Sequence, residues 1–286
     1  MVFDEIGEID IRGENIARAV KGFALKKFKL RQILKVESSS NLTETYYEES
    51  NTILTASGTR NIQGVTRGAL PPELHPSWQK TSADHIKFMG QATIFYEDVL
   101  LDAIPVQART FIRVAEAIVN SEDSYIYTQL TAATGTSGVV AAAATWNNAV
   151  EQNRDPIGDL ILGIAAIGSN NYEVRANGFL LVNETDYGSL LRNTKVINHQ
   201  SFKEFDVVVN GLVSKLLSLK IIVTDTVTAT EAMIVVGQRA ATWKTAAAFK
   251  AVAIVNPGIT TKIRAWEMGQ LQITDPQGLY TITGTA

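Results

Sequence analysis

The alternation of apolar and polar positions predicts three helices. Residues 10–34 carry apolar side chains mostly three or four positions apart, which indicates an amphipathic helical arm. A longer helix starts at Pro105, because proline is favoured in a first turn, and keeps one apolar face as far as Ala133. At 1.5 Å per residue it reaches about 40 Å, which predicts a backbone for the whole molecule. A third helix begins with Asp155 as its N-cap and ends near Gly168.

Residues 37–84 have a different character. They are rich in Ser, Thr, Asn, Gly and Pro, with short β-prone pieces between the turns. Such a segment cannot close a core of its own, and long coreless loops in compact domains are usually functional or disordered. We therefore expect a two-stranded arm that lies on a neighbouring molecule. Its return limb contains Pro71, Pro72 and Pro76, which discourage sheet growth there, and residues 85–98 then predict a strand.

Strands dominate the C-terminal part of the chain. Residues 178–182 form a continuous apolar run, which is typical of a strand covered on both faces. Asn183 or Thr185 can cap the short helix that follows and carries Tyr187. Further short apolar runs predict strands at 207–212, 220–226, 232–238, 249–255, 261–268 and 271–275. The predicted fold class is therefore α+β.

Composition narrows the classes of function. Only 19% of the residues are charged, a low value that suits a surface covered by other copies of the chain. Cysteine is absent and the three histidines are at unrelated spacings, so the sequence predicts no disulfide and no zinc site. No signal-peptide pattern occurs, and no run approaches the roughly 20 apolar residues of a membrane helix. We expect a soluble protein that folds in a reducing cytoplasm.

The positive charge is concentrated near the N-terminus. Between Arg12 and Lys35 there are eight cationic residues and one acid, Glu14. A basic arm of this kind can contact nucleic acid through its phosphates, or it can be the solvated face of an amphipathic helix. The sequence leaves both interpretations open.

No catalytic, cofactor-binding or metal-binding constellation emerges. The sequence contains no phosphate-binding loop, no GxGxxG motif, no GxSxG elbow and no HExxH motif. In Glu97-Asp98 and Glu122-Asp123 adjacent carboxylates point apart, which predicts solvated or capping roles. Asp186 is at a position where a catalytic acid could stand, but a helix-capping role is the simpler explanation.

The four tryptophans are divided between two roles. Trp146, Trp243 and Trp266 are expected in the core. Trp78 lies in the proline-rich limb, where an exposed aromatic side chain would anchor a partner.

The order of these segments resembles the major capsid proteins of tailed double-stranded DNA viruses, which have the Hong Kong 97 fold. A basic arm leads to VTRGALPPELHPSWQKTSADHIKFMGQATIFYEDVLLDA, which resembles that family's extended loop (E-loop) and return strand. The helix from Pro105 resembles its spine helix. DPIGDLILGIAAIGSNN and GFLLVNETDYGSLLRN resemble parts of the peripheral domain, FDVVVNGL through AMIVVGQRAA the axial domain, and LQITDPQGLYTITG the final peripheral strand.

The resemblance implies a division of the chain into five consecutive segments. They are an N-terminal arm (1–36), an extended loop (37–100), a peripheral domain with the spine helix (101–204), an axial domain (205–255) and a return to the peripheral domain (256–286). Some members carry a fused scaffold or crosslink their subunits. Here a scaffold is expected to be absent or separate, and no motif marks a crosslink.

The resemblance also implies a structural role without catalysis or cofactors. The chain would assemble as pentamers and hexamers into an icosahedral shell around double-stranded DNA. Implied subunit contacts are Arg60, Arg67 and Trp78 in the loop, and the arm residues that contact a neighbour or the lumen are Lys26, Lys27 and Lys29. Further implied partners are portal, scaffold and decoration proteins, but no membrane; the location is the virion, after assembly in the host cytoplasm. The alternatives are an encapsulin-type nanocompartment shell and a small hydrolase or binding protein.

Overall fold

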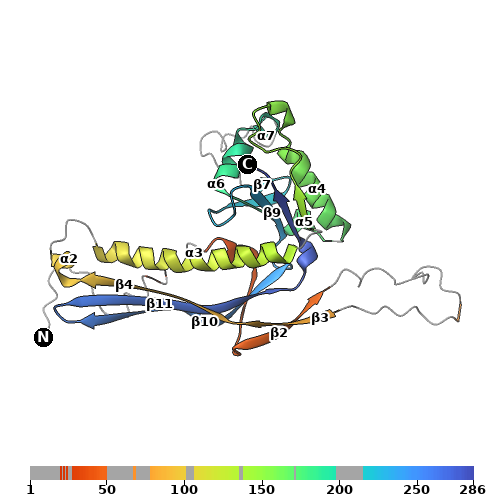
Figure 1. Cartoon of the computed structure of the whole chain (residues 1–286). Helices are drawn as coiled ribbons and strands as arrows, with labels where there is room; N and C mark the ends of the chain where they lie inside the picture. Colours follow the sequence, from red (N-terminus) through yellow and green to blue (C-terminus); the bar gives the residue numbers. More distant parts are fainter. Residues whose placement is uncertain are drawn as a thin grey trace.

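The computed structural model describes residues 20, 22, 24, 28–49, 67–68, 78–100, 106–134, 138–170, 172–197 and 215–286. Figure 1 shows a long lower layer, a compact upper lobe above one end of that layer, and a hairpin that projects beyond the same end. Helices and strands are mixed along the chain, which confirms the predicted α+β class.

The lower layer is a four-stranded sheet with one long helix on it. The strand order is β1 (Lys35–Ser38), β10 (Ala241–Asn256), β11 (Thr260–Ile273) and β4 (Ile86–Phe95). Helix α3 (Val106–Thr134) runs along one face of this sheet (Figure 1). Its apolar side chains, among them Ala115 and Ile118, join Phe88 and Ala265 of the sheet in one buried core. This packing confirms the predicted backbone helix and its apolar face.

The upper lobe is built on a six-stranded sheet. Its order is β5 (Val139–Ala141), β12 (Leu279–Thr283), β9 (Glu231–Val236), β6 (Gly178–Val182), β8 (Leu219–Val223) and β7 (Lys215–Leu216). Helix α4 (Pro156–Ser169) packs against it, and Leu160 and Ile167 share a second buried core with Leu180 and Ile234. Residues 178–182 are apolar throughout because both faces of β6 are covered: Leu180 and Val182 belong to the core of the upper lobe, whereas Leu181 belongs to the core of the lower layer.

The remaining helical elements are short. They are η1 (Leu30–Ile33), α2 (Tyr96–Leu100), η3 (Glu151–Asn153), α5 (Val174–Asn177), α6 (Glu184–Leu191), α7 (Thr194–Ile197) and η5 (Pro276–Gly278). Asn183 is the N-cap of α6, as predicted, because its Oδ1 accepts a hydrogen bond from the backbone N–H of Thr185 over 3.1 Å. The predicted arm helix is described only at residues 20, 22 and 24, which are helical, and from 28 onward, where a 3-10 turn leads into β1.

Two of the three tryptophans expected in the core are fully buried. Trp146 packs in the upper lobe and Trp243 in the lower layer. Trp266 is only half-buried, because it lies on the face of the lower sheet that is opposite α3.

The two sheets draw on segments that are far apart in the sequence. The upper sheet joins β6 to β9, which come from the predicted segments 101–204 and 205–255, and the lower sheet takes β10 and β11 from either side of residue 256. The names peripheral and axial refer to positions in an assembled shell. The five-segment division therefore stays a prediction.

Candidate functional site: assembly surfaces

The hairpin formed by β2 (Thr43–Glu49) and β3 (Trp78–Asp84) makes few contacts with the rest of the chain, mainly with β11 and at the cavity that Glu48 lines. It is attached at its base, where the backbone N–H of His85 donates to the carbonyl of Leu42 and Gln272 donates to Glu44 over 2.9 Å. Tyr47 and Trp78 farther along the hairpin are 57% and 52% exposed. A two-stranded hairpin is marginally stable in water when it stands alone. Its exposed aromatic side chains therefore make it a surface that needs a partner.

The three predicted loop contacts are only partly placed. Trp78 is at the outer end of the described hairpin, paired with Glu49, and Arg67 is exposed in a turn. Arg60 lies outside the described residues. A contact of these residues with another subunit stays a prediction.

The predicted arm contacts are also partly placed. Lys26 and Lys27 lie outside the described residues. Lys29 is exposed, and its Nζ donates to the carbonyl of Val223 at the end of β8 over 2.8 Å. This hydrogen bond links the segment before η1 to the upper lobe of the same chain. Whether Lys29 also meets a neighbour or the lumen stays a prediction.

Behind Lys29 lies a buried ionic cluster that the sequence did not reveal. Arg31 of η1 donates through Nε to Oε1 of Glu122 over 2.8 Å and through Nη2 to Oε1 of Glu267 over 2.8 Å. Asp123 accepts hydrogen bonds from the backbone N–H groups of Lys29 and Leu30, each over 3.3 Å. The three carboxylates are buried. The cluster thus connects η1, α3 and β11.

The prediction of solvated or capping roles for Glu122 and Asp123 is wrong. Both side chains lie on α3 where the segment around η1 covers the helix, so a face that is polar in sequence is buried in the structure. Burial raises the pKa of Glu122 to about 8, although Arg31 opposes this shift. Burial likewise raises the pKa of Asp123 to about 6. The sequence did contain one indication of this arrangement. The basic segment between Arg12 and Lys35 could supply a cationic partner for the adjacent acids Glu122 and Asp123.

Asp186 also behaves differently from a solvated cap. It lies in the first turn of α6 as predicted, yet it is fully buried, and its Oδ2 accepts a hydrogen bond from the backbone N–H of Thr230 over 3.3 Å. Burial raises its pKa. The Asp186 carboxylate thus links α6 to the turn before β9, and this structural contact explains why an acid stands at this position.

The face of the lower sheet opposite α3 is cationic and partly apolar. Residues directly opposite one another in adjacent strands share a face, and the registers align Met89 with Trp266 and Lys250, and Thr93 with Lys262 and Ile254. The cations of this face are Lys87, Lys244, Lys250, Lys262 and Arg264, and Lys244 pairs with Glu37 of β1 on the same face. Within strands β4, β10 and β11 the single carboxylate, Glu267, is buried in the ionic cluster on the other side.

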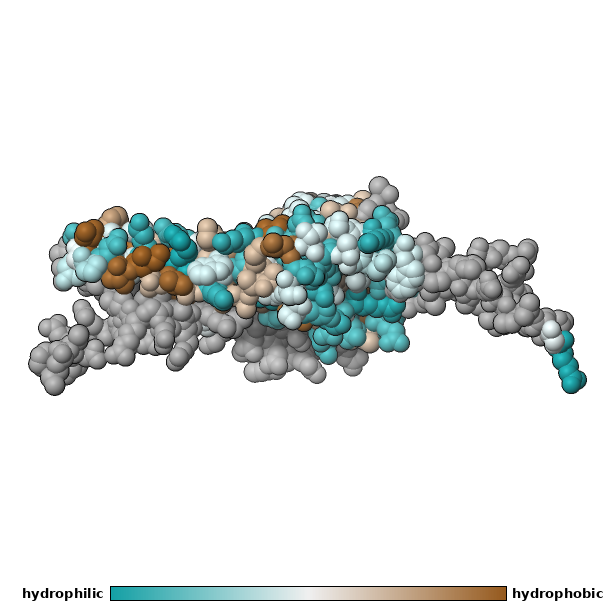
Figure 2. Space-filling view, turned by 90° about the horizontal axis from the view of Figure 1, so that it is seen from below, coloured by the Kyte–Doolittle hydropathy of each residue, from teal (hydrophilic) through white to brown (hydrophobic). Residues whose placement is uncertain are grey.

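Apolar side chains on this layer gather toward the far end of the β10–β11 hairpin. Figure 2, which views the molecule from below, shows brown residues concentrated at that end. Exposed apolar residues of this region are Phe95, Val252, Ile254, Val255 and Ile259. A patch of this kind marks a surface for contact with another protein.

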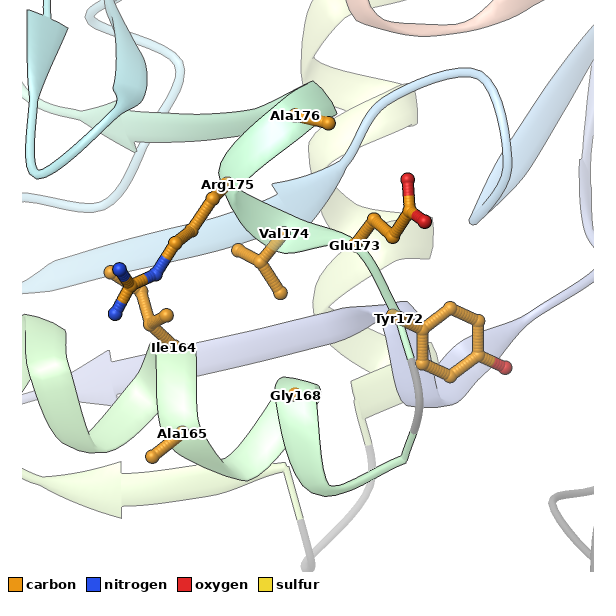
Figure 3. Close-up of a pocket in the computed structure, with 8 residues that line it drawn as sticks. All are labelled: Ile164, Ala165, Gly168, Tyr172, Glu173, Val174, Arg175 and Ala176. Atoms are coloured by element: carbon orange, nitrogen blue, oxygen red, sulfur yellow. The ribbon is translucent and has the colours of Figure 1, made fainter.

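The upper lobe carries a groove of about 520 Å³ between α4 and α5. It is lined mainly by small and apolar residues, such as Ile164, Gly168 and Val174. Figure 3 shows that the charged side chains of Glu173 and Arg175 point away from each other at opposite ends of the groove. The lining therefore brings no acid–base pair together, and the groove does not have the arrangement of an active site.

The described residues contain neither a metal cluster nor a membrane-spanning helix. Within the described part of the chain, no cluster of three or more His, Asp or Glu side chains could hold a metal ion. Among the helices of the described residues, none combines the length and the apolar character needed to cross a membrane.

Several solved structures are similar to this fold. The virus-like particle from Pyrococcus furiosus is similar at 13% identity and a TM-score of 0.64, with 94% of this chain and 98% of that chain covered. The capsid of the native GTA particle is 13% identical, with a TM-score of 0.65 and coverage of 100% and 96%. The mature capsid of bacteriophage PhiM1 is 10% identical, with a TM-score of 0.65 and coverage of 99% and 91%. These similarities confirm the Hong Kong 97-like fold. No curated protein sequence matches the chain.

The sequence itself matches a family model described as phage capsid protein over residues 79–284. That match excludes the alternative of a small hydrolase, and an encapsulin-type shell is the alternative that remains. The chain therefore belongs to the phage capsid protein family and is a structural protein of the capsid shell, with no enzymatic role.

Proposed function

We propose that the chain assembles with copies of itself, as pentamers and hexamers, into an icosahedral virion shell that encloses double-stranded DNA. The proposal includes assembly in the host cytoplasm and contacts with portal, scaffold and decoration proteins. It draws on the family, whose model covers residues 79–284, and on solved relatives that are capsids and particles.

One observation carries the self-assembly part of the proposal, and it is the projecting hairpin. The β2–β3 hairpin extends past the end of the lower layer in Figure 1, and the aromatic rings of Tyr47 and Trp78 are more than half exposed. Covering these rings removes apolar area from water, which stabilises the contact by about 25 cal/mol for each Å² that is buried. The described part of the chain leaves these rings exposed, and we infer that another copy of the chain covers them in the shell.

Charge supports the same arrangement. The hairpin strands carry the acids Glu44, Glu48, Glu49 and Asp84 against one cation, Lys80. The face of the lower sheet opposite α3 carries five cations in strands β4, β10 and β11 against one acid, Glu37 of β1, which pairs with Lys244. Opposite potentials favour encounter and fix the register of two surfaces. We therefore place the hairpin of one copy on the lower sheet of the next.

The test removes the hairpin and observes assembly. A variant lacking residues 45–80 is expected to remain folded, with little change in its thermal unfolding midpoint, and to form no particles by size-exclusion chromatography or negative-stain microscopy. Trp78→Ala is expected to reduce particle yield without changing the stability of the free subunit. Particles of normal size from the deletion variant would overturn the proposal.

A second measurement separates a virion shell from a nanocompartment. Particles purified from infected or expressing cells are treated with nuclease and then opened. Protected double-stranded DNA is expected for a virion shell, whereas an encapsulin-type shell would contain protein cargo and no protected genome.

A further inference from the structure

A polar cleft of about 530 Å³ lies where the hairpin, the lower layer and the upper lobe meet. Its lining includes Glu48 of β2, Thr134 at the end of α3, Asn170 just beyond α4, and Gln277 of η5. Four elements that are distant in the sequence therefore share this one cavity. Its volume is within the range of small-ligand sites in proteins.

Two helices end at this cleft. Ala133 and Thr134 are the last residues of α3, and Ile167 and Ser169 belong to the last turn of α4. The carboxyl end of a helix carries a partial negative charge, which basic side chains in the last turn usually compensate. Neither α3 nor α4 has a basic residue in its last turn. The negative ends of both helices thus act on the cavity without a compensating cation from either helix.

The side chains that line the cleft strengthen this bias. Glu48 contributes a half-buried carboxylate. Gln277 contributes an amide whose Oε1 is buried and accepts no hydrogen bond. A buried acceptor without a donor costs free energy, so this oxygen favours a ligand that can donate. Among the described residues that line the cleft there is no Lys, Arg or His.

The chemistry of the lining indicates the class of ligand. A metal ion is usually held by several carboxylate, imidazole or thiolate groups, and this cleft offers one carboxylate beside neutral oxygens. Ammonium and guanidinium groups instead bring several N–H donors and one diffuse positive charge, which suit scattered acceptors. We propose that the junction cleft binds an ammonium or guanidinium group, from a free polyamine or from a lysine or arginine of a second copy.

Occupancy of the cleft would fix the direction of the hairpin. The bound group would contact Glu48 near the outer end of the described hairpin, together with the ends of α3 and α4 and the η5 turn. It would thereby join the hairpin to both layers by one charged group. The site goes beyond the proposed shell function, because it can be measured on free subunits.

The first experiment measures thermal unfolding of the unassembled full chain with spermidine and with MgCl₂ at equal ionic strength. At about ten times the dissociation constant, spermidine is expected to raise the unfolding midpoint by roughly 2–4 °C. Glu48→Gln is expected to abolish this rise, and Glu151→Gln, which removes an exposed carboxylate elsewhere, is expected to keep it. An equal response to Mg²⁺ would overturn the assignment to an ammonium group.

A matched pair of variants tests whether the cleft lacks a cation. Gln277→Lys introduces an ammonium group at the cleft, and it is expected to raise the unfolding midpoint of the free subunit and remove its response to spermidine. Gln277→Met has a similar length without charge and is expected to do neither. If both variants behave alike, the inference is wrong.

The last arm separates the two sources of the group. Spermidine that stabilises free subunits but not assembled particles indicates that a side chain of a second copy fills the cleft in the shell. Stabilisation of both indicates a free polyamine. If spermidine stabilises neither free subunits nor particles, only a side chain of a second copy can be the bound group. In that case Glu48→Gln should reduce particle yield at least tenfold relative to Glu151→Gln. Failure of that difference as well would overturn the proposal, even if the shell function is correct.

Discussion

The guanidinium group of Arg31 and the carboxylate of Glu122 form a buried pair, with Nε and Oε1 2.8 Å apart. The same guanidinium reaches Glu267 on β11, and it lies 3.9 Å from the centre of the Phe28 ring. Ninety-one residues separate Arg31 from Glu122 in the sequence. The pair therefore holds the segment that enters the fold against the long helix and the sheet beneath it.

Loss of Arg31 should destabilise the subunit strongly. Arg31→Ala leaves Glu122 and Glu267 buried without their cation, which typically costs about 3–5 kcal/mol. Urea denaturation of the full chain measures this change. Arg113→Ala is the control, because Arg113 is 84% exposed and its pair with Glu116 is worth under about 1 kcal/mol. Equal losses for the two variants would show that the buried pair has no special role.

Stability should fall as the pH rises above neutrality. The pKa of Glu122 is raised from 4.5 to about 8, and that of Asp123 from 3.8 to about 6, in both cases mainly by burial. The folded chain thus binds more protons than the unfolded chain, so this stabilisation is complete below about pH 4 and is lost as the pH rises through 6 and 8. Urea midpoints should therefore decline from pH 5 to pH 8. Glu122→Gln should flatten this decline between pH 5 and pH 8, and an unchanged slope would contradict this account.

Two glycines of the upper lobe should respond to alanine in opposite directions. A Cβ at Gly178 would overlap the backbone carbonyl oxygen of Val174 and a methyl group of Leu219, so Gly178→Ala should cost about 1–3 kcal/mol. A Cβ at Gly188, inside α6, meets nothing within 4 Å, and Gly188→Ala should stabilise the chain by about 0.5–1 kcal/mol. Thermal unfolding of both variants checks the difference, and a shift of the same sign would refute it.

Charge reversal on the lower sheet should weaken assembly without weakening the fold. Lys262→Glu puts an acid among the cations of the face opposite α3, where the acidic hairpin of a neighbour is proposed to dock. Particle yield should fall several-fold at low salt and recover partly as salt screens the repulsion. Light scattering during assembly measures this effect. Arg113→Glu, on the solvent side of α3, serves as the control, and an equal defect there would argue against a specific docking face.

The sequence was sufficient to predict elements whose pattern is local. Helices α3 and α4 and strand β6 lie where their periodicity indicated, and Asn183 caps α6. These features depend on residues within one or two turns of one another. They are fixed by spacing and capping chemistry, which a single sequence contains.

Features that depend on distant segments were not predictable in this way. Spacing showed that Glu122 lies on a polar side of α3, but it could not show that the segment around Arg31 covers that side. Likewise, the predicted strands 249–255 and 261–268 are parts of longer strands whose length depends on pairing with β4 and β1. The junction cleft could not be predicted for the same reason, because Glu48 and Gln277 line one cavity only in the folded chain.

The paired strands β10 and β11 have a mechanical consequence. At roughly 3.3 Å per residue, the 16 residues of β10 span about 50 Å, and the ladder is regular except for two register shifts between Thr245 and Lys250. Bulges of this kind bend a strand and increase its twist. They lie between the part of β10 that pairs with β1 and the part that carries the apolar tip, so they set the direction in which the tip leaves the core.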